Sequence, residues 1–227
     1  MKLRQMVVML TTLALATPLA AQLFGPKQPT LSGIWHPVVG AGATYETTRD
    51  GKKNDMEMTI VGKEDVDGKP AFWLEMAMTD QRTSQPVYVK TLMAVSDNNI
   101  TSTRMVMQMP GQDPMEMDMN MNAMGRGMKQ TTPVNIADKA EIVGTESVTV
   151  PAGTFSCTHF RMKDGSGEAW VSDKVSPWGL VKSQSKDSTM VLAKVITDAK
   201  DHITGTPKKF DMGQMMRGMG QQGQQPQ

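Results

Sequence analysis

Residues 56–78 read MEMTIVGKEDVDGKPAFWLEMAM, and this stretch decides the fold class. Apolar and polar side chains alternate on both sides of an Asp-Gly pair at positions 67–68. Such alternation is the pattern of a strand with one buried face, and Asp-Gly is a strong signal for the two-residue turn of a β-hairpin. The stretch therefore predicts two antiparallel strands, with Phe72 and Leu74 on one face and Trp73 on the other.

Similar alternating runs, each bounded by turn residues, extend in both directions from this hairpin. They predict further strands over residues 42–49, 87–95, 100–109, 141–150, 154–163, 168–172, 180–185 and 189–197. The chain thus holds about ten strands and almost no helical periodicity, and neighbouring hairpins favour an antiparallel order. We expect an all-β protein whose sheet closes on itself, pairs with a second layer or is covered, because bare edges invite aggregation.

A segment of different composition interrupts the strands. Residues 110–133 read PGQDPMEMDMNMNAMGRGMKQTTP, with no β-branched residue before Thr131. We expect a long Met-rich loop or flap there, holding at most one short strand. The predicted domain organisation is a signal peptide at 1–21, a linker at 22–34, a β domain at 35–204 and a disordered Met- and Gln-rich tail at 205–227.

The first 21 residues have the layout of a secretory signal peptide. Lys2 and Arg4 form a basic start, an apolar run follows at residues 6–16, and small residues end at Ala21. The apolar run is too short to span a bilayer, and no Cys follows the cleavage region to accept the acyl group of a lipoprotein. We therefore expect Sec-type export to the periplasm or the medium, with no transmembrane segment after cleavage.

Composition and charge argue against several classes of function. A single Cys rules out a disulfide framework and multi-cysteine metal sites. Removal of Lys2 and Arg4 with the signal leaves 22 basic and 23 acidic residues, a net charge of −1, so no basic field attracts nucleic acid. The sequence also lacks a nucleophile elbow, a dinucleotide-binding glycine motif and an HExxH motif. We expect a protein that is not an enzyme, holds no cofactor and does not bind nucleic acid.

Two stretches of the second half carry a family resemblance. Residues 143–163 read VGTESVTVPAGTFSCTHFRMK, and residues 168–184 read EAWVSDKVSPWGLVKSQ. Over about residues 35–200 the chain resembles exported bacterial proteins of the LolA/LolB-like superfamily. This resemblance implies an incomplete, half β-barrel with a concave apolar face, and several members carry lipids or lipoprotein acyl chains. The helices that usually cover the concave face are not evident here, so the Met-rich segment at 110–133 could take their place.

Methionine is unusually frequent, at 23 residues, of which three fall in the signal peptide. One repeat at every second position comprises Met115, Met117, Met119 and Met121, whose sulfurs would all lie on one side of an extended chain. Three interpretations of the methionines compete. The first is that Met acts as adaptable core filler in the predicted strands. It applies to Met56, Met58, Met76, Met78, Met105 and Met107.

The second interpretation is an adaptable site for an apolar ligand such as a lipid or a lipoprotein acyl chain, because flexible thioether surfaces tolerate varied partners. Its predicted ligand-binding residues are Met105, Met107, Met109, Met115, Met117, Met119, Met121 and Trp73. The third is Cu(I) binding or copper buffering by the four alternating methionines, since thioether sulfur is soft. A structural or interaction protein of the cell envelope, with an unidentified protein partner, is the remaining alternative.

Cys157 and His159 lie two positions apart on a predicted strand, so they share a face. With Met162 they match the ligand types of a blue-copper site, but such ligands lie on a loop with more residues between Cys and His. A second His would have to come from His36 or His202, which lie outside the predicted strands. We expect instead a buried free thiol beside a hydrogen-bonded His.

Overall fold

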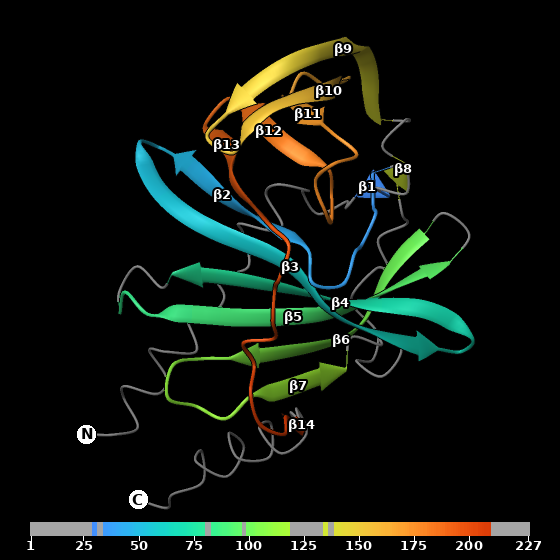
Figure 1. Cartoon of the computed structure of the whole chain (residues 1–227), viewed down its shortest axis with the longest axis vertical. Helices are drawn as coiled ribbons and strands as arrows, with labels where there is room; N and C mark the ends of the chain where they lie inside the picture. The colour runs from blue at the N-terminus through green and yellow to red at the C-terminus, as the bar shows by residue number, and fades with distance from the viewer. Residues whose placement is uncertain are drawn as a thin grey trace, which may run out of the picture.

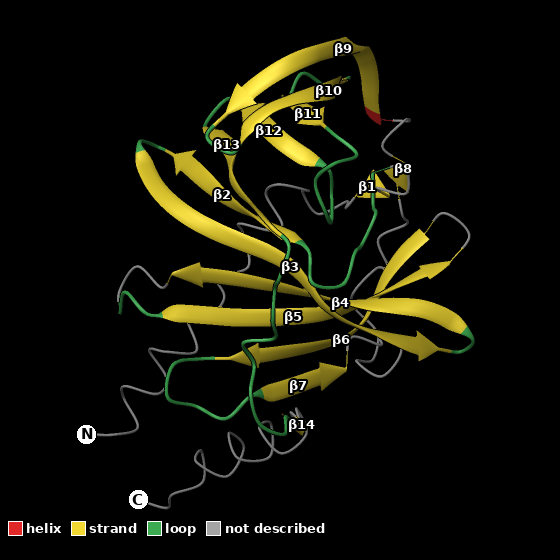
Figure 2. Ribbon diagram, in the orientation of Figure 1, coloured by secondary structure: helices red, strands yellow, loops and turns green. Residues whose placement is uncertain are grey.

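The computed structural model describes residues 29–30, 34–79, 83–96, 99–118, 134–135 and 139–209. Within these ranges the chain is almost entirely β-structure (Figure 2). The described strands form one sheet of twelve strands and a separate pair (Figure 1). No helical segment in these ranges has the length and apolar character that a bilayer crossing requires. The prediction of an all-β, mostly antiparallel fold with little helix is confirmed.

The predicted strands appear with bounds that move by only a few residues. The large sheet contains β2 (Gly42–Arg49), β3 (Lys52–Val66), β4 (Lys69–Thr79), β5 (Pro86–Ser96), β6 (Asn99–Gln108), β7 (Met115–Asp118), β9 (Ala140–Val150), β10 (Gly153–Met162), β11 (Gly167–Val171), β12 (Leu180–Ser185), β13 (Ser188–Ile196) and β14 (Lys208–Lys209). The small parallel pair is β1 (Pro29–Thr30) with β8 (Val134–Asn135). The spatial order of the large sheet is β14-β7-β6-β5-β4-β3-β2-β13-β12-β11-β10-β9.

The turns that join β2, β3 and β4 adopt the conformation that their residues favour. Asp50 and Gly51 have φ angles of 49° and 75°, and Asp67 and Gly68 have φ angles of 54° and 75°. Positive φ at both central residues is the mark of the type I′ turn, whose twist matches that of the flanking strands. The Asp-Gly pair at positions 67–68 therefore locates the β3–β4 hairpin correctly, and Asp50-Gly51 forms the same kind of turn between β2 and β3.

The large sheet curls so that its two halves face each other across the core. Figure 1 places β9–β13 above β4–β7, with the 15-residue strand β3 crossing between them. The β3–β4 ladder shifts register between Ile60 and Gly62, an irregularity of the kind that bends a strand. The main core lies between the halves, where Met58 and Ile60 from β3 join Trp170 from β11 and Met190 from β13. A smaller cluster of Ala71, Leu92 and Ala94 lies apart from it. The sheet is open and does not close into a barrel.

A loop between β11 and β12 fills part of the concave side. Trp178 of this loop lies against Trp35, with ring centroids 4.3 Å apart, and both belong to the core or pack on it. Gly179 ends the loop at φ 67°, where an added Cβ would lie only 2.7 Å from a methyl group of Val171. Only glycine tolerates both the positive φ and this close approach. The tryptophan pair therefore adds aromatic surface to the core.

The other face of β4–β7 is crossed by residues 197–209, here called the C-terminal strap. The strap runs from the end of β13 across β3–β6 to β14, as Figure 1 shows. Backbone hydrogen bonds anchor it at both ends, from Ala199 N–H to the Gly40 carbonyl (2.8 Å) and from Lys208 N–H to the Pro114 carbonyl (2.9 Å). The strap thus includes the start of the predicted tail, whereas residues 210–227 and the predicted signal peptide lie outside the described residues.

Candidate functional site

Four methionines form a patch on the concave face of the sheet. In the register of β6 and β7, Met105 lies opposite Met117, and Met107 lies opposite Met115. Residues two apart in a strand share a face, so all four side chains project from the same side. Their Cβ atoms therefore mark a rectangle of about 5 Å across the strands and about 7 Å along them. We call these four residues the methionine patch.

The methionine patch continues along the sheet into the core. One row of neighbouring positions, here called the apolar row, crosses five strands from β7 to β3: Met115, Met107, Val89, Met76 and Met58. Met58 at the inner end is only 5% exposed, and Val89 is 8% exposed, whereas Met76, Met107 and Met115 are half-buried. An uninterrupted apolar surface thus leads from the centre of the protein to half-buried Met115, beyond which Lys208 of β14 is the next residue in the row.

The methionines of the strands therefore fall into two groups. Met56 and Met58 are buried, and Met76 and Met78 pack against the core, which confirms the prediction of core filler for these four residues. Met105 and Met107 were also predicted to be core filler, but they are half-buried and do not belong to the described core. The patch thus groups four half-buried methionines that lie outside the described core cluster.

The turn after β6 folds the chain back and creates the patch. Gln112 N–H donates to the Met109 carbonyl at 3.1 Å, and Gly111 adopts φ 69°, a conformation open to glycine at no steric cost. The returning strand β7 then places its methionines opposite those of β6. Glu116 of β7 lies opposite Val106, so its side chain projects from the other face of the sheet. The acidic residue between Met115 and Met117 therefore points away from the patch.

The structure separates the remaining residues that the sequence assigned to ligand binding. Met119 and Met121 lie outside the described residues. Met109 follows β6 and lines a cavity on the outer face, the face that the C-terminal strap crosses. Trp73 also projects from the outer face, because it alternates with Leu74, which belongs to the core. Met109 and Trp73 therefore do not share a site with the methionine patch.

Trp73 lies in a charged environment. Its indole N–H donates to a carboxylate oxygen of Glu64 at 2.7 Å, and Glu64 also pairs with Arg104. The Arg104 guanidinium lies 5.0 Å from the indole ring centroid, and the Lys90 ammonium lies 5.3 Å from it. Cations at these distances are attracted to the face of an aromatic ring. Trp73 therefore holds charged side chains in place on the outer face.

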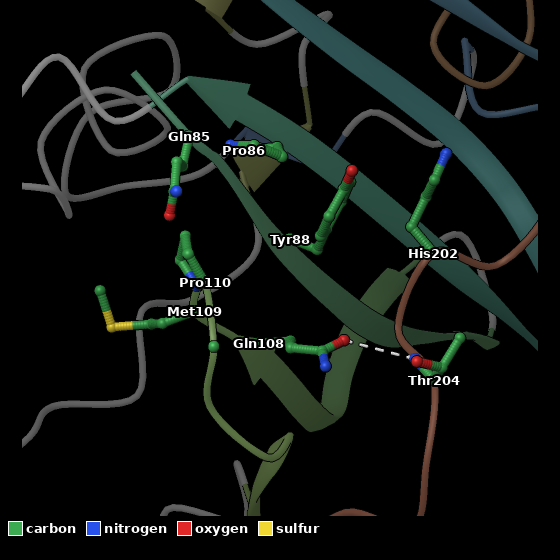
Figure 3. Close-up of a pocket in the computed structure, with 9 residues that line it drawn as sticks. Gln85, Pro86, Tyr88, Gln108, Met109, Pro110, His202 and Thr204 are labelled. Atoms are coloured by element: carbon green, nitrogen blue, oxygen red, sulfur yellow. Dashed lines mark hydrogen bonds between the residues drawn. The ribbon is translucent and has the colours of Figure 1, made fainter. Parts of the chain in front are cut away.

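The cavity on the outer face has a volume of about 340 Å³ and opens beside the strap. Figure 3 shows Tyr88 and Gln108 of the sheet together with His202 and Thr204 of the strap around it, and Met109 pointing away from Tyr88. Thr204 N–H donates to Gln108 Oε1 at 3.3 Å, and the His202 ring stacks on Tyr88 with centroids 4.8 Å apart. The residues that border the cavity are thus also those that fasten the strap to the sheet.

A buried carboxylate, Glu75, lies under the strap. Its side chain is only 2% exposed, it accepts a hydrogen bond from the His202 backbone N–H at 3.2 Å, and the His202 Nδ1 atom lies 2.7 Å from its Oε1. Burial raises the pKa of Glu75, hydrogen bonds from His202 oppose that rise, and Asp201 adds to it. Asp201 in turn pairs with Lys90. Sequence reasoning missed this cluster, because no local pattern connects two residues 127 positions apart.

In the other half of the sheet, Cys157 and His159 share a face as predicted. Cys157 is a buried free cysteine, and burial together with the charge of Glu146 raises the pKa of its thiol. His159 stacks on Trp170 with ring centroids 4.5 Å apart, and its Nδ1 lies 3.0 Å from Glu146. In the described ranges no three His, Cys, Asp or Glu side chains are grouped so as to hold a metal ion. The expectation of a buried free thiol is confirmed, and the neighbouring His159 pairs with Glu146, whereas its buried Nε2 atom has no hydrogen-bond partner among the described residues.

Comparison with known proteins identifies no family for the chain. No family model matches it, and no curated protein matches it significantly. Among solved structures it is similar to a presumed exported protein with a YmcC-like fold from Bacteroides fragilis, with 19% identity, a TM-score of 0.39 and a match that covers 71% of this chain and 98% of the other. A presumed lipoprotein from Parabacteroides distasonis shows 14% identity and a TM-score of 0.37, over 71% of this chain and 97% of the other.

MucB is also similar in structure. The identity is 12% and the TM-score 0.43, and the match covers 78% of this chain but only 60% of MucB. For the complex of MucA and MucB from Pseudomonas aeruginosa the TM-score is 0.40, and the match covers 73% of this chain and 55% of the other. Likenesses with identities and TM-scores this low carry no argument about the ligand, partner or location of this chain.

Proposed function

We propose that this protein is exported and binds an apolar ligand, of the lipid or acyl-chain class, along the apolar row, with the methionine patch at its exposed end. The observation that carries the proposal is the row itself, which leads without a polar interruption from buried Met58 to half-buried Met107 and Met115. An apolar molecule gains free energy from leaving water wherever it can cover such a surface. The exposed end of the row is therefore the natural place for it to bind.

Methionine suits this kind of binding surface. Its unbranched side chain has three rotatable bonds and a polarisable sulfur, so it can adapt to ligands of varied shape. Removal of roughly 200 Å² of apolar surface from water would contribute about 5 kcal/mol before the entropic costs of binding are subtracted. Val89 and Met58 of the same row are buried. The row thus combines a fixed inner end with an adjustable outer end.

We also propose that the protein is not an enzyme and that it reaches its compartment by the predicted signal peptide. The buried Glu75 is engaged by the strap, and His159 is engaged by Glu146 and Trp170. Neither Glu75 nor His159 belongs to the apolar row. The function that we propose is the burial of a ligand's apolar surface, and this requires no change in any covalent bond.

The proposal is tested with the fluorescent fatty acid cis-parinaric acid and the full exported chain. We expect saturable binding, and we expect the double variant Met107→Lys/Met115→Lys to bind at least about tenfold more weakly, equivalent to 1.4 kcal/mol, because two charges interrupt the row. Thr101→Lys, at an exposed position of β6, is the matched control and should bind as the wild type does. Absence of binding to the wild type, or equal binding by the double variant, would contradict the proposal.

Native mass spectrometry of the protein purified from an exporting host identifies the ligand class. We expect an added mass that corresponds to a lipid or fatty acid and that disappears from Met107→Lys/Met115→Lys. A wild-type chain that carries no such mass and also takes up no added fatty acid would favour the structural or interaction protein of the cell envelope instead.

A further inference from the structure

The methionine patch gathers four thioether sulfurs as well as apolar surface. Met105 and Met107 lie opposite Met117 and Met115 in the β6–β7 register. On the other side of β6, the same two residues lie opposite Thr91 and Val89 of β5, neither of which carries a charge. The patch therefore offers soft sulfur ligands, and the neighbouring side chains of β5 add no group that titrates.

We propose that the methionine patch binds one Cu(I) ion through the sulfur atoms of its four methionines. Thioether sulfur is a soft ligand that suits Cu(I), whereas hard cations such as Mg²⁺ and Ca²⁺ prefer oxygen. Partial exposure of the four side chains leaves a path by which an ion can reach them. This activity goes beyond the binding of an apolar ligand and does not depend on it.

The pairing of two strands makes a single site feasible. Along one extended strand, four alternating methionines would spread over about 20 Å, too far apart to bind one ion. Across β6 and β7, the four Cβ atoms instead lie within a rectangle of about 5 Å by 7 Å. Metal–sulfur bonds of about 2.3 Å need sulfurs roughly 4 Å apart. Because the methionine side chain is long and flexible, sulfur atoms can come this close together even though their Cβ atoms lie farther apart.

A site of this composition has a characteristic response to pH. Cys, His and carboxylate ligands must lose a proton to bind a metal ion, so the affinity of sites built from them falls in acid. The methionine sulfur has no proton to lose, and Thr91 and Val89 beside the patch do not titrate either. Lys208 of β14 lies opposite Met115 on the other side of β7 and pairs with Asp113 at 2.6 Å. A lysine and a carboxylate both keep their charges between about pH 5 and pH 8. Glu116, between two patch residues in the sequence, projects from the opposite face. The Cu(I) affinity of the patch should therefore stay constant between about pH 5 and pH 8, a range in which His sites lose affinity.

The test is an anaerobic competition for Cu(I) between the full exported chain and the chromophoric chelator bicinchoninate. We expect one equivalent to bind with a dissociation constant on the order of 1 µM or tighter. The variant Met105→Leu/Met107→Leu/Met115→Leu/Met117→Leu keeps the apolar volume and removes the sulfur, so it should bind at least about tenfold more weakly. The matched control replaces Met119, Met121, Met124 and Met128 by Leu and should bind as the wild type does.

Two further measurements keep the inference separate from the proposed function and from any loss of folding. The leucine variant should still bind cis-parinaric acid, because Leu preserves the apolar surface, and its circular dichroism should match that of the wild type. X-ray absorption of the wild-type Cu(I) complex should show sulfur ligands alone. Binding weaker than micromolar, equal affinity in the leucine variant, loss of binding in the control variant, or nitrogen or oxygen ligands would each overturn the inference.

Discussion

The two faces of β4–β7 are built from the same strands, yet they differ in chemistry and in how far they are closed. The outer face carries Trp73, Glu75 and Lys90, and the C-terminal strap is fastened across it by hydrogen bonds and ion pairs. The concave face carries the apolar row and leaves the methionine patch half-buried. Alternation along a strand thus gives these strands one face that the strap covers and one whose outer end stays half-buried. The binding surface that we propose lies on the second, concave face.

The largest expected effect compares the two ends of the apolar row. Met58→Ala should lower the free energy of unfolding by about 2–5 kcal/mol, because it leaves a cavity in the core. Met115→Ala should cost about 1 kcal/mol or less, because its half-buried side chain removes less apolar surface from water. Urea unfolding of both variants measures the difference. Equal losses would show that the patch is as much a part of the core as β3.

The next effect concerns the strap. His202→Ala removes the imidazole beside the buried Glu75 carboxylate, and we expect a loss of about 1–3 kcal/mol in the free energy of unfolding. Hydrogen exchange should become faster in residues 197–209. Lys200→Ala, at an exposed position of the strap, serves as the control and should leave both measurements unchanged. An unperturbed His202→Ala variant would mean that other contacts hold the strap.

A smaller effect appears in the pH dependence of stability. The pKa of Glu75 is raised above its ordinary value of 4.5, mainly by burial, so the folded protein keeps this proton to a higher pH than the unfolded chain does. The contribution of this group to stability is therefore complete below pH 4.5 and is lost as pH rises through the raised pKa. Glu75→Gln removes the titration, so its free energy of unfolding minus that of the wild type should increase as pH rises through this range.

That difference is measured by urea unfolding of the two proteins at a series of pH values that starts below 4.5. A difference that stays flat with pH would show that Glu75 titrates alike in the folded and unfolded chains. A difference that decreases would give its pKa shift the opposite sign.

The smallest effect concerns Cys157 of β10, in the half of the sheet that faces the apolar row across the core. Burial and the Glu146 charge raise the pKa of its thiol, which reduces the fraction of reactive thiolate. The native protein should react with a disulfide reagent such as DTNB at least about tenfold more slowly than the chain unfolded in urea. Equal rates would mean that the thiol is exposed in solution.

The strands and their hairpins could be predicted from the sequence because their signals are local. Alternation and Asp-Gly pairs sufficed for β2, β3 and β4, and β12 has the bounds that were predicted. The pairing of β13 with β2 and the crossing of the strap could not be predicted, since they join segments that are distant in the sequence. Long-range pairing is set by the packing of the whole core, which no short pattern encodes.

The candidate site was predictable in part. Alternation correctly placed Met115 and Met117 on one side of an extended segment. Their pairing with Met105 and Met107 depends on the turn at residues 109–114, which brings β7 back beside β6. Trp73 was grouped with these methionines because sequence alone does not decide which face of a strand covers the core.

The central claim, that ligand binds the concave face, is tested most directly by hydrogen exchange of the full chain with and without cis-parinaric acid. We predict slower exchange in residues 105–117, which carry the methionine patch, and unchanged exchange in the strap at residues 197–209. Protection of the strap, with residues 105–117 unaffected, would place the ligand on the outer face and contradict the account.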